Sequence, residues 1–352
     1  MSPPRTAAIL PSRNEPSTIS AVTTAVDHAL GDEHAVIIHA DSSDTPDTAM
    51  QFAATPTRAN TLSLAGLPRG KGAQILAALR RPELADAEVV LIADTDTRNP
   101  DPAVYCALLD QGRAGAALAI ADYPRHWDEA NLTNHVARPL IAATTGLDVP
   151  QPLAGDLAIS RRALAAAQKA AAELLDDLAQ CVDGYGIDAF LLLTAATTGP
   201  VNSVRLKEPK AHAGSFDHLP AIFHQAVPVL LHLTATWPLP PAPARSGAAL
   251  YRATDRTLPP GRVRAMVTAL TDLGTGPAGY DGGPWPAHLA GAWRAVTSGT
   301  TAIGAAGQLW PSYLQRVCDW LTTAQHASPQ HRAQILTAAH DRLRTELATG
   351  AP

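Results

Sequence analysis

The chain has 352 residues, of which 46% are hydrophobic and 17% are charged, and its formal net charge is -5. This length and composition predict one large domain or two smaller ones and exclude a disordered chain. Lysine and arginine are dispersed along the sequence, which argues against a nucleic-acid partner and against a membrane surface as a partner.

Three widely spaced cysteines, Cys106, Cys181 and Cys318, argue against a disulfide framework and against a zinc site. The N-terminal residues lack a signal-type apolar segment, and the most apolar run, residues 227–233, is too short to span a bilayer. We therefore expect a cytoplasmic protein whose partners are soluble molecules.

Residues 6–115 alternate short β-rich runs with helical patterns. Because helices connect the successive strands, we expect parallel pairing with right-handed crossovers in an open α/β sheet covered on both faces. Such sheets bind ligands at the carboxyl ends of their strands. The expected strands are 7–10, 35–39, 61–64 and 89–93, and the expected helices are 17–30, 46–54, 71–80 and 102–111.

The rest of the chain is expected to change character at residue 217. Before it, the patterns predict strands at 116–121 and 201–206, a helix at 136–144 and an Ala-rich helix at 163–178. After it, the pattern is helical with Pro- and Gly-rich breaks. We therefore predict an α/β domain over 1–216, with two halves at about 1–122 and about 123–216, and a helical C-terminal extension over 217–352.

Five of the six tryptophans lie in this extension, where packing between helices is their expected role. A homodimer contact through the extension and its closure over an acceptor both remain open.

The segment Asp94-Thr95-Asp96 directly follows the apolar run 89–93. Alternate residues of an extended segment point the same way, so the two carboxylates can converge on one divalent cation that bridges the phosphates of a nucleotide. The alternative interpretation is a strand end followed by an ordinary polar turn.

Further motifs surround this segment in a fixed order over residues 6–213. They are Leu10-Pro11-Ser12-Arg13-Asn14-Glu15, Asp41-Ser42-Ser43, Gly70-Lys71-Gly72, Asn99-Pro100-Asp101-Pro102, Val136-Ala137-Arg138-Pro139-Leu140, Gln151-Pro152-Leu153-Ala154-Gly155-Asp156, Gly184-Tyr185-Gly186-Ile187-Asp188, and Val204-Arg205 with Ala211-His212. The ordered set resembles the retaining GT-A glycosyltransferases of the glucosyl-3-phosphoglycerate synthase and mannosylglycerate synthase kind. The resemblance implies a GT-A fold, which is a Rossmann-like open sheet of nucleotide-diphospho-sugar transferases.

The resemblance also implies that residues 1–216 form a catalytic domain with a donor half at about 1–122 and an acceptor half at about 123–216. It further implies a donor site and a metal site. Asp94, Asp96 and His212 would bind Mg²⁺ or Mn²⁺, with diphosphate oxygens of the donor completing the coordination. An unpaired surface histidine is the alternative for His212, and helix capping is the alternative for Glu15 and Asp41. The residues implied in nucleotide-sugar binding are Pro11, Arg13, Glu15, Asp41, Ser42, Gly70, Lys71, Asp94 and Thr95.

The implied chemistry is sugar transfer with retention of anomeric configuration by front-face attack. Asp96, Asp156 and Asp188 are the residues expected in the catalytic site, with Asp156 and Asp188 orienting hydroxyl groups of the donor or acceptor. The family usually carries Glu at the positions of Asp156 and Asp188. This shortening leaves the identity of the transferred sugar open.

A second departure concerns the acceptor. Relatives that use phosphoglycerate carry Arg where Asn131 stands here, so a bidentate phosphate clamp is lost. We therefore expect a small soluble acceptor other than 3-phosphoglycerate, bound by Asn131, Thr133, Asn134 and Tyr185.

Several other functions stay open at this point. One is a thioglycosyltransferase of lincosamide-type antibiotic biosynthesis that joins a GDP-sugar to ergothioneine, and another is glucosyl-3-phosphoglycerate synthase itself. A sugar-1-phosphate nucleotidyltransferase is disfavoured because no Gly-rich loop follows the first expected strand. A non-catalytic nucleotide-sugar-binding protein is disfavoured because Asp94, Asp96 and His212 are all present. The donor base, UDP or GDP, is not predicted.

Overall fold

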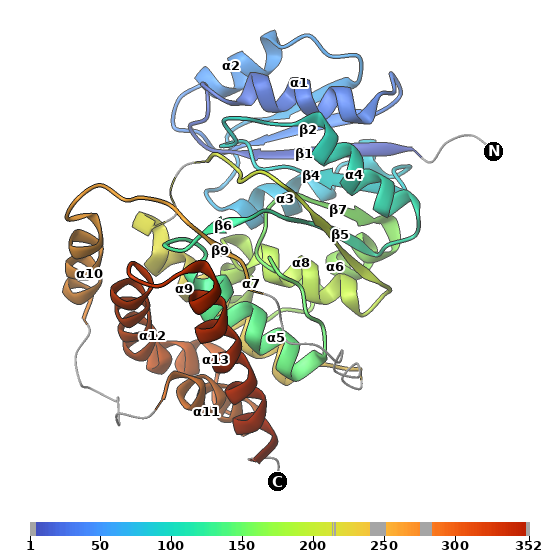
Figure 1. Ribbon diagram of the computed structural model, residues 1–352. Helices are drawn as coiled ribbons and strands as arrows, with labels where there is room; N and C mark the ends of the chain where they lie inside the picture. The colour runs from blue at the N-terminus through green and yellow to red at the C-terminus, as the bar shows by residue number, and fades with distance from the viewer. Residues whose placement is uncertain (1–4, 213, 215, 240–250, 275–283, 350–352) are drawn as a thin grey trace. The chain divides into compact units, whose positions relative to one another are not determined.

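The computed structural model describes residues 5–212, 214, 216–239, 251–274 and 284–349 (Figure 1). The chain divides into two compact units. The first, here called the sheet unit, comprises residues 1–123 and 151–226, and the second, the helical unit, comprises residues 124–150 and 227–352. This grouping differs from the division predicted at residue 217, because residues 124–150 pack with the C-terminal helices.

The sheet unit is built on a seven-stranded sheet with the strand order β3-β2-β1-β4-β7-β5-β8. All neighbouring strands are parallel except β7, which runs antiparallel to both β4 and β5. The mixed α/β fold class is confirmed, whereas β7 was not predicted. The strands are β1 (Thr6–Ser12), β2 (Val36–Asp41), β3 (Asn60–Leu64), β4 (Val89–Ile92), β5 (Leu118–Asp122), β7 (Leu157–Ser160) and β8 (Val201–Arg205).

Helices cover both faces of this sheet, as expected for strands that are apolar on both sides (Figure 1). On one face, Ala8, Leu10 and Leu91 form a single core cluster with residues of α1 (Ile19–Leu30) and α4 (Pro102–Arg113). The helix α2 (Asp47–Ala54) packs on α1. On the other face, α3 packs on β1 and β2 and contacts the three helices that follow β7. These helices are α3 (Lys71–Leu79), α6 (Arg161–Ala172), α7 (Asp176–Asp183) and α8 (Ile187–Ala196).

Two helices of the sheet unit differ from the expected ones. The single helix predicted over 163–178 is divided into α6 and α7, and Ser160 begins α6 by accepting a hydrogen bond from the Ala163 backbone N–H at 3.3 Å. The helix α8 was not predicted. Eight of its ten residues are buried, so its sequence is apolar all round and lacks the one-sided period that marks a surface helix.

The helical unit contains α5 (Arg138–Thr145), α10 (Arg262–Asp272), α11 (Trp285–Thr297), α12 (Ala302–Ala324) and α13 (Pro329–Thr349). It also holds the strand pair of β6 (Arg125–His126) and β9 (Ala253–Thr254). Residues of α9 (Leu219–Ala235) are shared between the two units. Among the described helices, none combines the length and the apolar character needed to cross a membrane.

Tryptophans organise the interior of the helical unit. Trp320 on α12 is almost fully buried, and its indole N–H donates to the carbonyl of Trp127 at 2.8 Å. The indole N–H of Trp285 donates to the carbonyl of His135 at 2.9 Å. Each ring is therefore buried with its one polar atom hydrogen-bonded, which fits the packing role expected for these tail residues.

His39 on β2 is a buried histidine that the fold keeps neutral. Its ring nitrogens lie 2.5 Å from Ser12 Oγ and 3.2 Å from Ser63 Oγ, and its ring stacks on Phe52 at 4.6 Å between centroids. Burial lowers its pKa to about 4, although the Asp41 charge acts in the opposite direction. The unfolded chain binds a proton at this residue near pH 6.5, so the unfolded state takes up more protons between the two values.

We therefore predict that the free energy of unfolding falls as the pH is lowered from about 6.5 to about 4, with His39 contributing on the order of 2 kcal/mol to this loss. Chemical denaturation at several pH values tests this with His39→Gln, which should flatten the slope in that window. His34→Gln removes an exposed histidine and is the control. An unchanged slope in His39→Gln would show that other groups cause the pH dependence.

Candidate active site

The carboxyl ends of β1, β2 and β4 meet at one edge of the sheet, because these strands are parallel neighbours. Asp41 ends β2 and is buried, and its Oδ1 accepts hydrogen bonds from Ser12 Oγ at 3.1 Å and from the Ser43 N–H at 3.0 Å. Gln74 Nε2 donates at 2.6 Å to both the Ser12 carbonyl and Ser42 Oγ. These bonds fix the backbone of the two strand ends where the nucleoside was expected to bind.

The end of β1 and the loop that follows it hold three residues predicted to bind the nucleotide-sugar donor, Pro11, Arg13 and Glu15. The carbonyl of Pro11 accepts a hydrogen bond from Thr95 Oγ1 at 2.8 Å, which ties this segment to the end of β4. Arg13 is half-exposed and lies 3.5 Å from Asp44. The Glu15 carboxylate accepts from Thr18 Oγ1 at 3.0 Å just before α1, and burial raises its pKa. This bond joins two side chains and does not cap a backbone N–H of α1, and the nucleoside contact of Glu15 stays a prediction.

Asp94, the first aspartate of the predicted metal motif, lies between two lysines. Lys71 Nζ is 2.9 Å from its Oδ1, and Lys210 Nζ is 2.9 Å from its Oδ2. Burial alone would raise the pKa of Asp94, but the charges of Lys210 and Lys71 lower it far below its ordinary value. Asp94 is therefore ionised, and each of its oxygens already contacts an ammonium group.

Each of these lysines also contacts a second carboxylate. Lys71 Nζ lies 2.9 Å from Asp188 Oδ1, and Lys210 Nζ lies 2.8 Å from Asp156 Oδ2. Burial alone would lower the pKa of both lysines, but their carboxylate partners raise it, so both remain protonated. We call this group of two lysines and three aspartates the lysine–aspartate cluster. It consists of Lys71, Lys210, Asp94, Asp156 and Asp188.

Asp156 is the innermost member of this cluster, with 0% of its surface exposed. It accepts hydrogen bonds from Tyr123 Oη at 2.8 Å and from the Asp94 backbone N–H at 2.9 Å, in addition to Lys210. Asp156 therefore positions the end of β4 and the ammonium of Lys210, and its contact with a substrate hydroxyl stays a prediction. Asp188 stands in the first turn of α8, where the helix N-terminus favours a negative charge.

Asp96 and His212 form the outer part of the site. Asp96 Oδ2 lies 4.0 Å from His212 Nδ1. Burial and the neighbouring Asp94 charge raise the pKa of Asp96. Two hydrogen bonds hold the His212 segment against the loop after β4. The Arg98 N–H donates to the Ala211 carbonyl at 2.8 Å, and the Ala211 N–H donates to the side-chain Oδ1 of Asn99 at 2.9 Å.

The donor set fits a divalent cation in part. Asp96 and His212 offer one carboxylate and one imidazole, which are ligand types that Mg²⁺ and Mn²⁺ accept together with phosphate oxygens. Asp94 is engaged by two ammonium groups, and within the described residues no three His, Cys, Asp or Glu side chains are gathered closely enough to hold a metal ion. Of the three predicted metal ligands, Asp96 and His212 therefore lie beside each other, whereas Asp94 forms ion pairs with Lys71 and Lys210.

Two residues of the site were not predicted from the sequence. Lys210 precedes His212 by two positions, and its side chain is only 4% exposed. Tyr123 directly follows β5 and donates to Asp156. A lysine among Lys207, Glu208 and Pro209 resembles an ordinary charged loop residue, so no local pattern distinguished it. The motifs around Asp94 and His212 indicated only that these segments approach each other.

The glycines of the site are required by close approach of the protein to itself. A Cβ on Gly72 would lie 1.7 Å from the Val182 carbonyl oxygen, and the Gly72 N–H donates to the Gly184 carbonyl at 3.2 Å. A Cβ on Gly70 would lie 2.3 Å from the Asp183 carbonyl oxygen. The Gly70-Lys71-Gly72 segment was predicted to approach a donor phosphate or base. In the structure it packs against the chain before α8, and this places Lys71 beside Asp188.

Gly155 packs directly on the cluster, because a Cβ at this position would lie 2.1 Å from Asp94 Oδ1 and 2.3 Å from Lys71 Nζ. We predict that Gly155→Ala separates this ion pair, lowers the free energy of unfolding by about 1–3 kcal/mol and reduces activity. Chemical denaturation and turnover assays measure the two effects. Gly307→Ala adds the same methyl group where no atom lies within 4 Å and is the matched control. Equal behaviour of the two variants would contradict the prediction.

The predicted acceptor residues are divided between the two units. Tyr185 belongs to the sheet unit and is half-buried, and burial raises its phenol pKa. The charges of Lys71 and Asp188 also act on this phenol, so Tyr185 is electrostatically part of the site. The other three, Asn131, Thr133 and Asn134, are buried residues of the helical unit.

The surroundings of Asn131 are acidic. Asn131 Nδ2 donates to the Asp128 carbonyl at 3.2 Å, and its Oδ1 is buried without a hydrogen-bond partner in the described part of the chain. The guanidinium of Arg256 contacts this segment from elsewhere in the chain. It pairs with Asp128 and lies 2.7 Å from Glu129. Its charge is therefore offset by two carboxylates.

Comparison with solved structures finds glucosyl-3-phosphoglycerate synthase from Mycobacterium tuberculosis. Its complex with Mn²⁺, UDP-glucose and phosphoglyceric acid is 26% identical, with a TM-score of 0.53 over 66% of this chain and 80% of that chain. The complex with phosphoglyceric acid is 27% identical, with a TM-score of 0.51 over 65% and 79% of the two chains.

A third complex of the same synthase holds Mg²⁺ and UDP, and it is 26% identical with a TM-score of 0.51 over 65% of this chain and 78% of that chain. No protein-family model and no curated protein sequence matches the chain. The structural resemblance confirms the predicted likeness to these synthases and the predicted GT-A-like fold with a helical C-terminal region.

Proposed function

We propose that this chain is a metal-dependent glycosyltransferase that moves a sugar from a nucleotide-diphosphate sugar to a small acceptor other than 3-phosphoglycerate. The structural resemblance to glucosyl-3-phosphoglycerate synthase supports the donor class, because those structures hold UDP or UDP-glucose with Mn²⁺ or Mg²⁺. The observation that carries the proposal is the Asp96–His212 pair, which lies beside the lysine–aspartate cluster and presents oxygen and nitrogen donors for a metal diphosphate.

We assign different residues to the nucleoside and to the metal diphosphate of the donor. Asp41 ends β2 and Glu15 follows β1, and carboxylates at such strand ends accept hydrogen bonds from the ribose or base of a nucleotide. Asp96 and His212 would hold the metal together with the diphosphate oxygens. When bound, the metal offsets the negative charge that builds on the departing nucleoside diphosphate.

The buried cluster supplies fixed charges next to this metal site. Lys71 and Lys210 are protonated, and both are held in place by carboxylates before any substrate arrives. Positioned charges of this kind favour a transition state in which the sugar becomes positive and the leaving group negative. Asp188 is buried, but 11% of its side chain is exposed, whereas Asp156 is 0% exposed. We therefore assign Asp188 to orienting a sugar hydroxyl.

No protein nucleophile is needed for this reaction. Transfer with retention follows if the acceptor attacks from the face that the diphosphate leaves, with a leaving-group oxygen accepting the acceptor proton. Asp156 is fully buried, and its carboxylate already accepts hydrogen bonds from Tyr123 and Lys210. We therefore assign it no role as a nucleophile.

The acceptor argument rests on Asn131. A neutral amide stands here among Asp128, Glu129 and an Arg256 that both acids neutralise. Such surroundings disfavour a phosphate group and suit a neutral or zwitterionic acceptor. A thiol acceptor, as in the lincosamide-type thioglycosyltransferases considered from the sequence, belongs to this class.

Calorimetric titration with UDP-glucose, GDP-mannose, UDP and GDP, each with and without Mn²⁺ or Mg²⁺, tests the donor site. We expect metal-dependent binding of one nucleotide series, and release of the nucleoside diphosphate once an acceptor is added. Release of pyrophosphate would indicate a nucleotidyltransferase, and metal-independent binding would contradict the proposed site. Equal turnover of 3-phosphoglycerate and neutral or thiol acceptors would contradict the acceptor assignment.

A further inference from the structure

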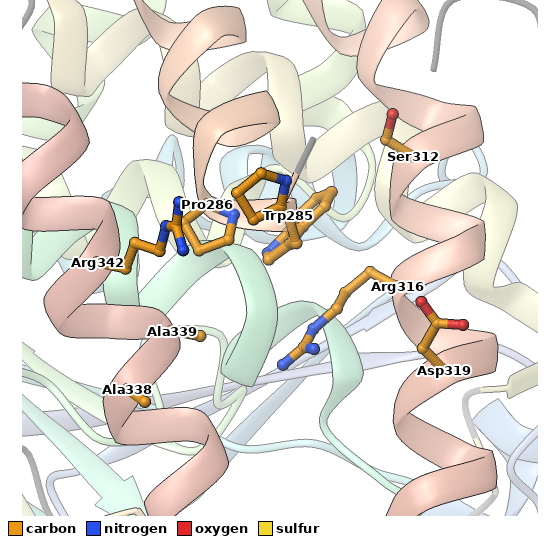
Figure 2. Close-up of a pocket in the computed structure, with 9 residues that line it drawn as sticks. Trp285, Pro286, Ser312, Arg316, Asp319, Ala338, Ala339 and Arg342 are labelled. Atoms are coloured by element: carbon orange, nitrogen blue, oxygen red, sulfur yellow. The ribbon is translucent and has the colours of Figure 1, made fainter. Parts of the chain in front are cut away.

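A cavity separate from the candidate active site is lined entirely by residues of the helical unit. It has a volume of about 360 Å³ and is formed where α11 begins and where α12 and α13 face each other (Figure 2). We propose that this cavity binds a small organic anion, with a carboxylate or phosphate group against Arg316 and an apolar body against Trp285. This proposal concerns residues of the helical unit alone, and it does not rest on the proposed glycosyltransferase function.

Arg316 is the residue that points to an anion. Its guanidinium lies inside the cavity lining, and its Nε and Nη2 atoms are buried without a hydrogen-bond partner among the described residues. Buried charged donors left without partners are costly, and they are rare in folded proteins unless water or an ion completes them. A bound carboxylate or phosphate would accept from both nitrogens at once, in the bidentate geometry that guanidinium groups favour.

A second guanidinium reaches the same space from the facing helix. Figure 2 shows Arg316 on α12 and Arg342 on α13 extending toward Trp285 and Pro286. The Arg342 side chain is 58% exposed and lies 3.5 Å from Glu346, so its contact is a weak surface pair that can be exchanged for a ligand. Asp319 also lines the cavity, and it accepts a hydrogen bond from Gln315 Nε2 at 2.8 Å. Two positive charges against one negative charge favour an anion.

The remaining walls suit an apolar body attached to that anion. Pro284, Trp285, Pro286, Ala338 and Ala339 present apolar surface to the cavity. The indole N–H of Trp285 is already bonded to the His135 carbonyl, so the ring offers its apolar surface rather than a donor. The volume is within the range of about 300–1,000 Å³ that small-molecule sites occupy. Water can enter a space of this size, but it does not neutralise the Arg316 charge.

A narrower recess beside the cavity shares three of its lining residues, Trp285, Pro286 and Ala339. His135 lines this recess, and both of its ring nitrogens are buried without hydrogen-bond partners in the described chain. Burial lowers the pKa of His135, and the Arg316 charge lowers it further, so the ring is neutral. A neutral imidazole adds no competing charge to the guanidinium.

The full-length protein is titrated calorimetrically with sodium benzoate, inorganic phosphate and, as a cation at matched ionic strength, choline chloride. We expect benzoate or phosphate to bind and choline not to bind. Arg316→Met should weaken anion binding by about tenfold to a hundredfold, because two charge-assisted hydrogen bonds are lost. Tighter binding of benzoate than of phosphate would assign a carboxylate ligand with an apolar body, and the reverse order would assign a phosphate ligand.

Two further variants keep the test decisive. Arg342→Gln changes a largely exposed residue that the fold does not need, and it should weaken anion binding several-fold even if Arg316→Met does not fold. Arg344→Gln alters a neighbouring exposed arginine on α13 that does not line the cavity, and binding should be unchanged. Absence of binding of both anions, or binding that both cavity variants leave intact, would overturn the proposal. These binding results concern the helical unit alone, so they neither support nor contradict the proposed sugar transfer.

Discussion

Replacing Asp96 with asparagine is expected to remove the metal-dependent part of donor binding and to lower kcat/KM for sugar transfer by roughly a thousandfold. Asp96 Oδ2 lies 4.0 Å from His212 Nδ1, whereas Asp94 is 2.9 Å from each of the two lysines of the cluster. Asparagine keeps the shape of the side chain but removes the charge that a divalent cation requires. The loss should therefore appear in binding and rate rather than in stability.

Titration of the variant with the preferred nucleotide in the presence and absence of Mn²⁺ measures this loss. Asp110→Asn, an exposed carboxylate on α4, is the matched control and should behave as wild type. Burial and the Asp94 charge raise the pKa of Asp96, so its replacement by a neutral amide should also relieve repulsion and leave the free energy of unfolding the same or higher. A variant that binds the nucleotide as the wild type does, with the same metal dependence, would refute the role of Asp96.

The sequence was most informative where structure is local. The strands β1 to β4 and their connecting helices were predicted because each apolar run is bounded by its own turn residues. The strand β7 escaped prediction because Leu157–Ser160 is only four residues long and finds its place between β4 and β5 through long-range antiparallel pairing. The helix α8 was missed for the opposite reason, since complete burial removes the period that identifies an amphipathic helix.

In the candidate site, too, local features were predicted and long-range contacts were not. The spacing of Asp94 and Asp96 at a strand end predicted a ligand site there, and that site stays a prediction. It did not predict that Lys210, 116 positions further along the chain, would contact Asp94 and Asp156. Which charges compensate each other is decided by tertiary packing, so the sequence identified the acidic residues and not the buried ammonium groups that hold them.

Lys210 gives the second large expected effect. Replacing it with methionine keeps much of the apolar stem but removes the ammonium that lies 2.8 Å from Asp156 and 2.9 Å from Asp94. Asp94 keeps its contact with Lys71, whereas Asp156 loses its ammonium partner. Removing one partner of a buried ion pair typically costs about 3–5 kcal/mol, because the remaining charge stays buried. We therefore expect Lys210→Met to lower the free energy of unfolding by about this amount, measured by chemical denaturation without metal.

The same variant should respond more strongly to metal than the wild type does. With the ammonium gone, Asp94 Oδ2 becomes available to a divalent cation next to Asp96, so Mn²⁺ should restore part of the lost stability and raise Tm by more than it does in the wild type. Lys207→Met removes an exposed lysine from the same segment and should change neither stability nor metal response. If Mn²⁺ stabilises Lys210→Met no more than the wild type, then Lys210 does not compete with a cation for Asp94, and its role is confined to holding the buried carboxylates in place.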